Sequence, residues 1–319
     1  MIVLALDIGG TKLAVGVVND AGDVLADAIE ATGDAPSADA VVERLLSMAR
    51  DAVSRSGIAW QELSGVGVSF GGPVDFPSGT TVRCHHLPGW ERFPLKDVVA
   101  ERSGLPATMD NDANAAALGE ATFGAARGCP HVLYLTVSTG IGGGVIIGGR
   151  VHRGASSMAG EIGHTLVAPD GPGCTCGRRG CLEAVAAGPG IAAAAGRALD
   201  AGEQSALSAI PRAALTAKDV AEAAETDALA ACIIGQAGEY LGIAIAGAVN
   251  LLNPNIVVIG GGVSGAGEVL FRPVREAVER YAVPESVRGL RIVPGALGRR
   301  GAMMGAAALA LTEGGWSPG

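Results

Sequence analysis

The sequence predicts an α/β protein built from two related halves in tandem, and two repeated patterns lead to this prediction. The first pattern is three antiparallel strands with a glycine-rich turn between the first two, and it begins at Leu4 and again at Leu133. The second is a helix followed by a buried strand and another glycine-rich turn, at 71–73 and at 260–262. Ligands in such folds bind where strand ends and glycine turns of the two halves face each other.

Hydrophobic periodicity and turn residues divide the chain into elements in the following order. The first half has strands at 4–7, at 13–18, near Val24 and at 66–68, with helices at 38–56 and 112–123. The second half has strands at 133–137, 145–147, 151 and 256–259, with helices at 183–200, 217–224, 227–252, 268–281 and 301–311. Residues 201–215 are the least patterned internal stretch, and we expect a loop there.

Length and composition narrow the class of protein. The chain has 319 residues, which suits about two domains. Hydrophobic residues make up 49% but aromatic residues only 3%, so the core must consist of small aliphatic side chains. A net charge of -9 disfavours a nucleic-acid surface. No basic region precedes the apolar residues 2–6, and the apolar stretch 241–252 is shorter than the ~20 residues of a membrane span. We expect a soluble, cytoplasmic protein with no membrane partner.

Two glycine-rich turns are candidate phosphate loops, because backbone N–H groups in such turns can cradle phosphate oxygens. The first turn follows Asp7 at the end of a strand, and this carboxylate could hold Mg²⁺ through water. The second turn adds hydroxyl donors. The residues of the two turns are Gly9, Gly10, Thr11 and Lys12, and Ser138, Thr139 and Gly140.

Asp112 is the candidate general base. Three polar residues, Asp110, Asn111 and Asp112, precede an alanine-rich helix, and helix capping explains Asp110 or Asn111. Asp112 falls in the first helical turn, where we expect the helix dipole to keep it ionised. An ionised carboxylate there could orient a substrate hydroxyl and accept its proton during phosphoryl transfer.

One imidazole and three thiols within eighteen residues predict a structural tetrahedral zinc site, with no open position for catalysis. Glycines at 171, 173, 177 and 180 let the loop turn tightly. The alternatives are unligated surface thiols or a disulfide, although two of the thiols are too close to pair comfortably. The ligands are His164, Cys174, Cys176 and Cys181; Glu161 and Glu183 bracket them, and their carboxylates suit the hydroxyls of a polar ligand. We expect the other cysteines, Cys84, Cys129 and Cys232, to be buried and reduced.

These motifs together resemble the ROK family (repressors, open reading frames and sugar kinases). The resemblance extends from about residue 2 to about residue 312. The zinc segment with Glu183 is highly specific to the family, whereas the glycine loops alone would not be. The residues that carry it are Asp7 to Lys12, Asn111 to Asn114, Ser138 to Gly144, the segment from Glu161 to Cys181 with Glu183, and Ile259 to Gly262.

The resemblance implies an actin-like ATPase (ribonuclease H-like) fold of two lobes with an interlobe cleft. The expected N-terminal lobe is residues 1–115 plus 300–319, the C-terminal lobe is 116–299 with the zinc segment, and the last helix packs back on the first lobe. The implied activity is glucokinase-like: ATP-dependent phosphorylation of a hexose, glucose first, at the 6-hydroxyl. The implied cofactors are ATP, Mg²⁺ and structural Zn²⁺, and family members form dimers or tetramers.

The resemblance also implies roles for single residues. Asp112 matches the family's catalytic base. The sugar-hydroxyl ligands would be Asn111, Asp112, Glu161, His164 and Glu183. The zinc ligands would be His164, Cys174, Cys176 and Cys181. Asp7, Gly10, Thr11, Thr139 and Gly140 fall on the phosphate loops, and Gly261 and Gly262 fall on the adenosine side.

Three points stay open at this stage. The acceptor could be N-acetylmannosamine, N-acetylglucosamine, fructose or allose, and the donor could be polyphosphate. A sugar-responsive transcription regulator is disfavoured by the acidic balance and by the position of Asp7, which leaves no room for a preceding DNA-binding segment. The chain also carries His85 and His86 where the family often has Asn-Leu-x-Gly-Trp, so the reading of one sugar substituent is in doubt.

Overall fold

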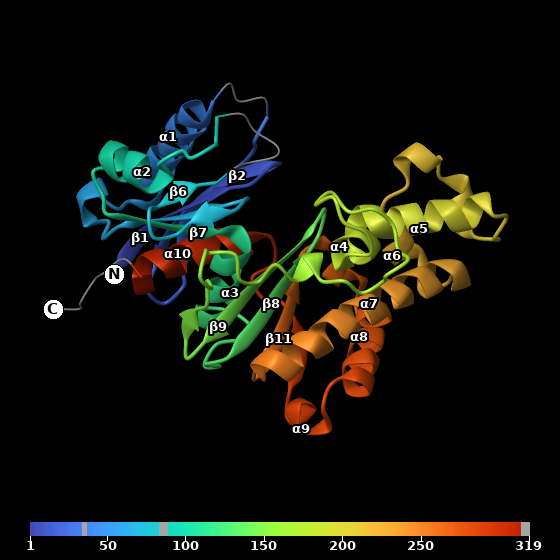
Figure 1. Ribbon diagram of the computed structural model, residues 1–319. Helices are drawn as coiled ribbons and strands as arrows, with labels where there is room; N and C mark the ends of the chain where they lie inside the picture. Colours follow the sequence, from blue (N-terminus) through green and yellow to red (C-terminus); the bar gives the residue numbers. More distant parts are fainter. Residues whose placement is uncertain (34–36, 83–88, 314–319) are drawn as a thin grey trace. The chain divides into compact units, whose positions relative to one another are not determined.

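The computed structural model describes residues 1–33, 37–82 and 89–313, and it is a mixed α/β structure (Figure 1). The strands are β1 (Ile2–Ile8), β2 (Lys12–Asn19), β3 (Val24–Ala31), β4 (Val66–Phe70), β5 (Val74–Asp75), β6 (Thr80–Thr81), β7 (Ala107–Asn111), β8 (Val132–Val137), β9 (Ile141–Ile147), β10 (Arg150–Val151), β11 (Ile256–Gly260) and β12 (Arg291–Pro294). The helices are α1 (Ala38–Ser56), α2 (Leu95–Ser103), α3 (Asp112–Thr122), α4 (Leu182–Ala186), α5 (Gly188–Asp200), α6 (Ala217–Ala223), α7 (Ala228–Leu252), α8 (Glu268–Tyr281), α9 (Pro284–Val287) and α10 (Gly301–Glu313).

Two five-stranded sheets share one topology. The first has the order β3-β2-β1-β4-β7 and the second β10-β9-β8-β11-β12, so in each the first strand of its series lies at the centre. β1 pairs antiparallel with β2 and parallel with β4. β11 pairs parallel with both β8 and β12. The duplicated strand pattern predicted from the sequence is therefore confirmed.

The chain divides into two compact units. Unit 1 comprises Met1–Pro130, Gly144–Ala159 and Ala296–Gly319, and unit 2 comprises His131–Gly143 and Gly160–Gly295. Residues 116–130, 144–159 and 296–299, which the sequence analysis assigned to the C-terminal lobe, group with unit 1.

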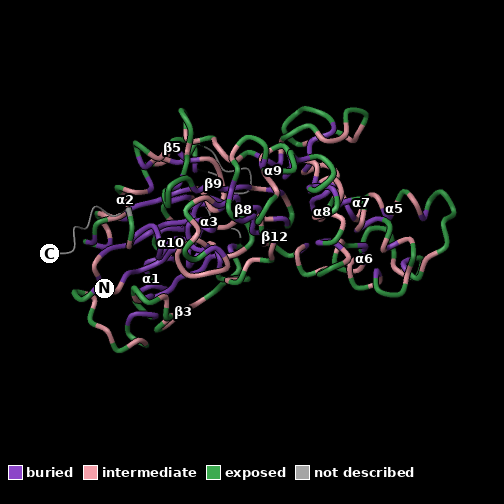
Figure 2. The backbone as a smooth tube through the Cα atoms, turned by 90° about the horizontal axis from the view of Figure 1, so that it is seen from below, coloured by how far each residue is buried: buried purple, intermediate pink, exposed green. Residues whose placement is uncertain are grey.

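Helices cover both faces of the first sheet in unit 1, because the side chains of β1 alternate between two apolar clusters. Leu4, Leu6 and Ile8 belong to a cluster with buried residues of α1 and α2. Val3 and Ala5 belong to a second cluster with Met303 and other residues of α10. Figure 2 shows the backbone of α10 mostly in the colour of buried residues. The predicted return of the last helix to the first half of the chain is thus found.

Glycine residues, which have no side chain, let α10 approach β4 closely. A Cβ atom at Gly67 of β4 would lie 1.8 Å from the carbonyl oxygen of Ala306 in α10. A Cβ atom at Gly305 would lie 2.0 Å from the carbonyl oxygen of Ala115 in α3. Only glycine fits at these two positions without a shift of the backbone, since real Cβ atoms do not approach a backbone oxygen so closely.

The predicted helix positions are mostly confirmed, with one break. Helices were expected at 38–56 and 268–281, and α1 and α8 have these bounds. The single helix expected over 183–200 is two helices, α4 and α5, which are separated at Ala187. Pro189 lies in the first turn of α5, and proline has no N–H to continue the hydrogen bonds of a preceding helix. The sequence analysis did not anticipate α2 and β7.

Among the described residues, α7 is the one helix that is long and apolar enough to span a membrane, with half of its most apolar window buried. A core helix of a soluble protein passes the same test. Close packing against α8 in unit 2 favours the core assignment. A Cβ atom at Gly242 would lie 2.4 Å from the Cβ of Ala277, and one at Gly238 would lie 2.7 Å from the carbonyl oxygen of Leu270.

The contact between β4 and α10 gives the first prediction. Gly67→Ala should lower the free energy of unfolding by at least about 2 kcal/mol, because the new methyl group forces the helix away from the strand. The matched control is Gly247→Ala on the exposed side of α7, where a Cβ meets nothing within 4 Å. That variant should be neutral or stabilised by up to about 1 kcal/mol. Urea denaturation curves of the two variants measure both effects, and equal midpoints would contradict the required close approach.

Candidate functional site

Asp7 ends β1 just before the first glycine-rich turn, and its carboxylate is buried with one oxygen left unbonded. Ser69 Oγ donates to Asp7 Oδ1 at 2.9 Å. Oδ2 has no hydrogen-bond partner among the described residues and lies 3.6 Å from Lys12 Nζ. Burial raises the pKa of Asp7, and the Lys12 ammonium group partly offsets this effect. An unbonded buried carboxylate oxygen fits a hydrated Mg²⁺, which prefers one or two carboxylates and keeps several waters.

The turn between β1 and β2 presents backbone groups to solvent. Gly9 N–H donates to the carbonyl oxygen of Lys12 at 2.9 Å, and this bond closes the turn. Gly10 and Thr11 at its tip are exposed. Thr32, the residue after β3, donates from its Oγ1 to the carbonyl oxygen of Gly9 at 2.7 Å and thereby stabilises the turn. The arrangement suits the backbone-mediated phosphate binding predicted for this segment.

Asp112 begins α3 and is half-buried in unit 1. Burial, with the nearby Asp7 carboxylate as the second cause, raises the pKa of Asp112 to about 7. The backbone N–H groups at the start of α3 act in the opposite direction but are the smaller effect. The expectation that the helix dipole keeps Asp112 fully ionised is therefore wrong, because desolvation and a like charge outweigh it. A carboxyl group with a pKa near neutrality is suited to general-base catalysis.

Asn111 is the N-cap of α3, as the capping alternative anticipated. Its Oδ1 accepts from Ala113 N–H at 2.9 Å. Its Nδ2 donates to the carbonyl oxygen of Gly72 at 3.0 Å. The amide plane is therefore held at both ends, and Nδ2 keeps a second hydrogen for a ligand. This orientation leaves the predicted sugar-binding role of Asn111 chemically possible.

The sequence analysis missed a buried ion pair that adjoins Asn111: Asp110, the preceding residue, pairs with Arg153. Arg153 Nε donates to Asp110 Oδ2 at 2.7 Å, and the Asp110 side chain is only 1% exposed. No local signal pointed to this pair, because the partners are 43 positions apart. The sequence analysis assigned Asp110 only a capping role and gave Arg153 none.

The second glycine-rich turn, in unit 2, is tied to Glu183. Ser138 N–H donates to the carbonyl oxygen of Gly140 at 2.9 Å and closes the turn. Glu183 Oε2 accepts from Ile141 N–H at 3.0 Å, directly after the turn. A Cβ atom at Gly140 would lie 2.6 Å from this Oε2, so the position requires glycine or a displaced Glu183. One predicted sugar ligand thus contacts one predicted phosphate loop.

The third glycine-rich turn of unit 2 lies against the second. Gly261 has a positive φ of 85°, which favours glycine. A Cβ atom there would lie 2.3 Å from the carbonyl oxygen of Val137, the residue that precedes Ser138. Gly262, which begins the following 3₁₀ turn, is exposed. The segment predicted for the adenosine side therefore adjoins the segment predicted for the phosphates.

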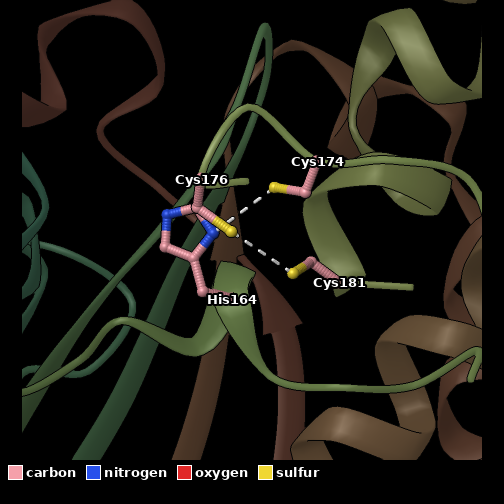
Figure 3. A group of neighbouring side chains, drawn as sticks. All are labelled: His164, Cys174, Cys176 and Cys181. Carbon is pink, nitrogen blue, oxygen red and sulfur yellow. Dashed lines mark hydrogen bonds between the residues drawn. The ribbon is translucent and has the colours of Figure 1, made fainter. Parts of the chain in front are cut away.

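The four predicted metal ligands converge in unit 2 (Figure 3). One ligand atom from each of His164, Cys174, Cys176 and Cys181 lies within 4.8 Å of the others. The Sγ atoms of Cys176 and Cys181 are 3.7 Å apart. Tetrahedral zinc with Zn–S bonds of about 2.3 Å separates two sulfurs by about 3.8 Å, so the set fits Zn²⁺. The spacing does not suit a disulfide, whose sulfurs are bonded at about 2 Å.

His164 faces the cluster with one ring nitrogen and Glu161 with the other. Its Nδ1 lies 3.7 Å from Cys174 Sγ, and its Nε2 lies 3.8 Å from Glu161 Oε2. A metal bound at Nδ1 would leave the proton on Nε2, which would then be a hydrogen-bond donor toward Glu161 or a bound hydroxyl. One imidazole can therefore serve both of the roles predicted for it.

The cysteine thiols differ in their surroundings. Burial raises the pKa of Cys181 to about 12, and the neighbouring cysteines add to the shift. A thiolate in that position therefore needs a bound cation. Outside the cluster, Cys129 is half-buried and Cys232 is exposed. The expectation of a buried Cys232 is wrong, because this residue lies on the outer side of α7. Cys84, His85 and His86 lie outside the described residues.

Comparisons with known proteins identify the family of the chain. The ROK family model matches residues 3–313. A glucokinase of Halalkalibacterium halodurans is 38% identical over 95% of this chain and 92% of its own length. The crystal structure of a ROK family glucokinase from Streptomyces griseus in complex with glucose and AMPPNP is 34% identical, covers 97% of this chain and 99% of its own, and has a TM-score of 0.82. A putative xylose repressor of Caldicellulosiruptor sp. is 30% identical over 98% of this chain and 78% of its own length.

The family match extends over nearly the whole described chain, and relatives above 30% identity cover more than nine tenths of it. The protein belongs to the ROK family.

Proposed function

We propose that the protein is an ATP-dependent sugar kinase that phosphorylates glucose at its 6-hydroxyl. The observation that carries the proposal is Asp112, a half-buried carboxyl group at the start of α3 whose pKa is raised to about 7. A group of this kind can take the proton of a hydroxyl as the hydroxyl attacks a phosphoryl group. Glucokinases of the same family support glucose as the acceptor and ATP as the donor.

The chain's own groups supply positioning and charge. Asp112 accepts the proton of the attacking hydroxyl, and Asn111, Glu161, His164 and Glu183 hold the other hydroxyls. The two turns at 9–12 and 138–140 hold the phosphates through backbone N–H groups and hydroxyls, and Gly261 and Gly262 lie on the adenosine side. Asp7 would hold Mg²⁺, which neutralises charge on the phosphates when it is bound. Phosphoryl transfer needs little covalent help, so orientation dominates the rate acceleration.

We assign the fold to the actin-like ATPase (ribonuclease H-like) class, whose members have two lobes and an interlobe cleft. The shared strand order of the two sheets supports this assignment. In this proposal the enzyme is a cytoplasmic homodimer or homotetramer that binds a sugar and ATP but neither nucleic acid nor membrane.

A coupled assay over a panel of acceptors tests the proposal. Glucose, N-acetylmannosamine, N-acetylglucosamine, fructose and allose are each supplied with ATP and, separately, with polyphosphate. We expect the highest kcat/KM with glucose and ATP, and NMR of the product should place the phosphate on the 6-oxygen. A better acceptor or donor within the panel would replace glucose or ATP. Phosphorylation of none of the sugars would overturn the assignment as a kinase.

Asp112→Asn should lower kcat by about 10²–10⁴-fold while glucose still binds, because the amide cannot accept the proton. Isothermal titration with glucose and steady-state kinetics measure the two effects. The matched control is Asp97→Asn, an exposed residue in the first turn of α2, which should behave as the wild type. Turnover of Asp112→Asn close to that of the control would refute the role of a base.

The raised pKa of Asp112 also predicts the pH dependence of the reaction. The base works only when it is deprotonated, so kcat/KM should rise about tenfold per pH unit in acid and level off above an apparent pKa of about 7. A pH profile between about 5 and 9 with saturating ATP measures this limb. A profile that is flat from about pH 5 upward, as an ordinary carboxyl pKa of about 4 would give, would contradict an essential Asp112 in the environment described.

Loss of the proposed zinc should disorder the loop that carries His164 rather than slow the phosphoryl-transfer step itself. Cys176→Ser should abolish stoichiometric zinc, lower the melting temperature and raise the glucose KM roughly tenfold, since the metal would fix the loop that carries His164. Cys232→Ser, outside the cluster, is the control. Elemental analysis, thermal denaturation and kinetics provide the readouts. Wild-type KM and stability in a verified zinc-free sample would count against the metal's ordering role.

A further inference from the structure

Arg153 is the strongest feature of unit 1 that the proposed mechanism does not use. Its side chain is 15% exposed, and its Nε donates at 2.7 Å to Asp110 Oδ2. Its guanidinium carbon also lies 3.4 Å from the centroid of the Phe76 ring. A guanidinium group that pairs with a buried carboxylate while stacking on an aromatic face has a fixed plane as well as a fixed charge.

The same carboxylate holds the residues that present the acceptor site. Asp110 Oδ1 accepts from Asn111 N–H at 2.7 Å and from Asn114 Nδ2 at 3.0 Å. Asn111 in turn caps α3, whose first residue is Asp112. Arg153 is therefore two hydrogen bonds away from the backbone of Asn111, and Asp110 is the only intermediate needed.

The chain around Arg153 is fixed to unit 1 at further points. Phe76 N–H donates to Ser157 Oγ at 3.2 Å, so Phe76 contacts this segment with both its ring and its backbone. Ala159 N–H donates to the carbonyl oxygen of Arg153 at 3.0 Å. Gly160 and Glu161 follow directly in sequence. The segment 153–159 is thus a short anchored loop immediately before a predicted sugar ligand.

We propose that Arg153 is a positioning residue for the phosphoryl acceptor: it holds Asp110 so that the turn between β7 and α3 presents Asn111 and Asp112 in a single geometry. The proposal rests on the proposed sugar-kinase function. Charge alone is not sufficient for this role, because the guanidinium plane is set by both the carboxylate and the Phe76 ring. A displacement of about 1 Å at a reacting group costs about 10²-fold in rate.

Three variants separate positioning from simple charge compensation. Arg153→Met removes both the charge and the planar guanidinium group, and it leaves Asp110 buried without its cation. Arg153→Lys keeps the charge but loses the planar guanidinium group. Arg153→Met combined with Asp110→Asn removes both charges, so folding does not suffer from an unpaired buried carboxylate. Arg102→Met, which breaks the exposed pairs with Asp39 and Glu43 in the same unit, is the matched control.

We expect Arg153→Lys and the double variant to keep melting temperatures close to that of the wild type, and their kcat/KM for glucose to fall about 10²-fold. The affinity for AMPPNP should not change, because neither phosphate loop contacts Asp110 through the bonds described. Arg102→Met should match the wild type in all of these measurements. Wild-type kcat/KM in either Arg153→Lys or the double variant would overturn the proposal, even if Arg153→Met itself does not fold.

Hydrogen–deuterium exchange over residues 107–118 gives a readout that needs no substrate. Faster exchange in this segment for Arg153→Lys and for the double variant, with other segments unchanged, supports positioning. Unchanged exchange overturns it. If the wild-type protein phosphorylates none of the sugars in the panel, the kinase assignment fails separately, and the exchange measurement alone decides the role of Arg153.

Discussion

Close backbone approach between α10, β4 and α3 is the constraint on which the rest of unit 1 depends. Gly67 and Gly305 leave no room for a Cβ atom, and the carbonyl oxygens of Ala306 and Ala115 occupy that space. Because interiors are packed as densely as crystals, such contacts leave few alternative positions for a helix. Packing against α10 therefore fixes the position of α3, and with it the position of Asp112, the first residue of that helix. A chain with larger core side chains could not place the Asp112 carboxylate in this way.

Three aspartates in unit 1 have different surroundings, and these give identical side chains different chemical properties. Asp110 is paired with Arg153 and accepts two further hydrogen bonds, which suits a structural anion. Asp7 has one oxygen bonded to Ser69 and one unbonded, which suits a cation. Asp112 has its pKa raised to about 7 by burial and by Asp7, which suits proton transfer. Different surroundings therefore suit three identical side chains to three different tasks: pairing with a cation of the protein, holding a metal ion and accepting a proton.

The sequence was sufficient for the local patterns and for the family, because these depend on residues close together in the chain. Hairpin turns, the bounds of α1 and α8 and the His–Cys₃ set all have short-range signals. The ion pair of Asp110 with Arg153 had no such signal, since only the folded chain brings the two together. The pKa of Asp112 was misjudged for the same reason. The helix dipole is a local effect, whereas burial and the Asp7 charge depend on tertiary structure.

Glu183 links two segments of unit 2, because its two carboxylate oxygens have different partners. Its Oε2 accepts from Ile141 N–H and fills the space beside Gly140, while its Oε1 lies 3.4 Å from Thr175 Oγ1 in the cysteine loop. Under the proposed roles, a hexose that shifts the Glu183 carboxylate also shifts the backbone at Ile141, directly after the turn that holds the triphosphate. Sugar and nucleotide would then bind with mutual cooperativity, and a free-energy coupling between them would arise within unit 2 without any movement of a domain.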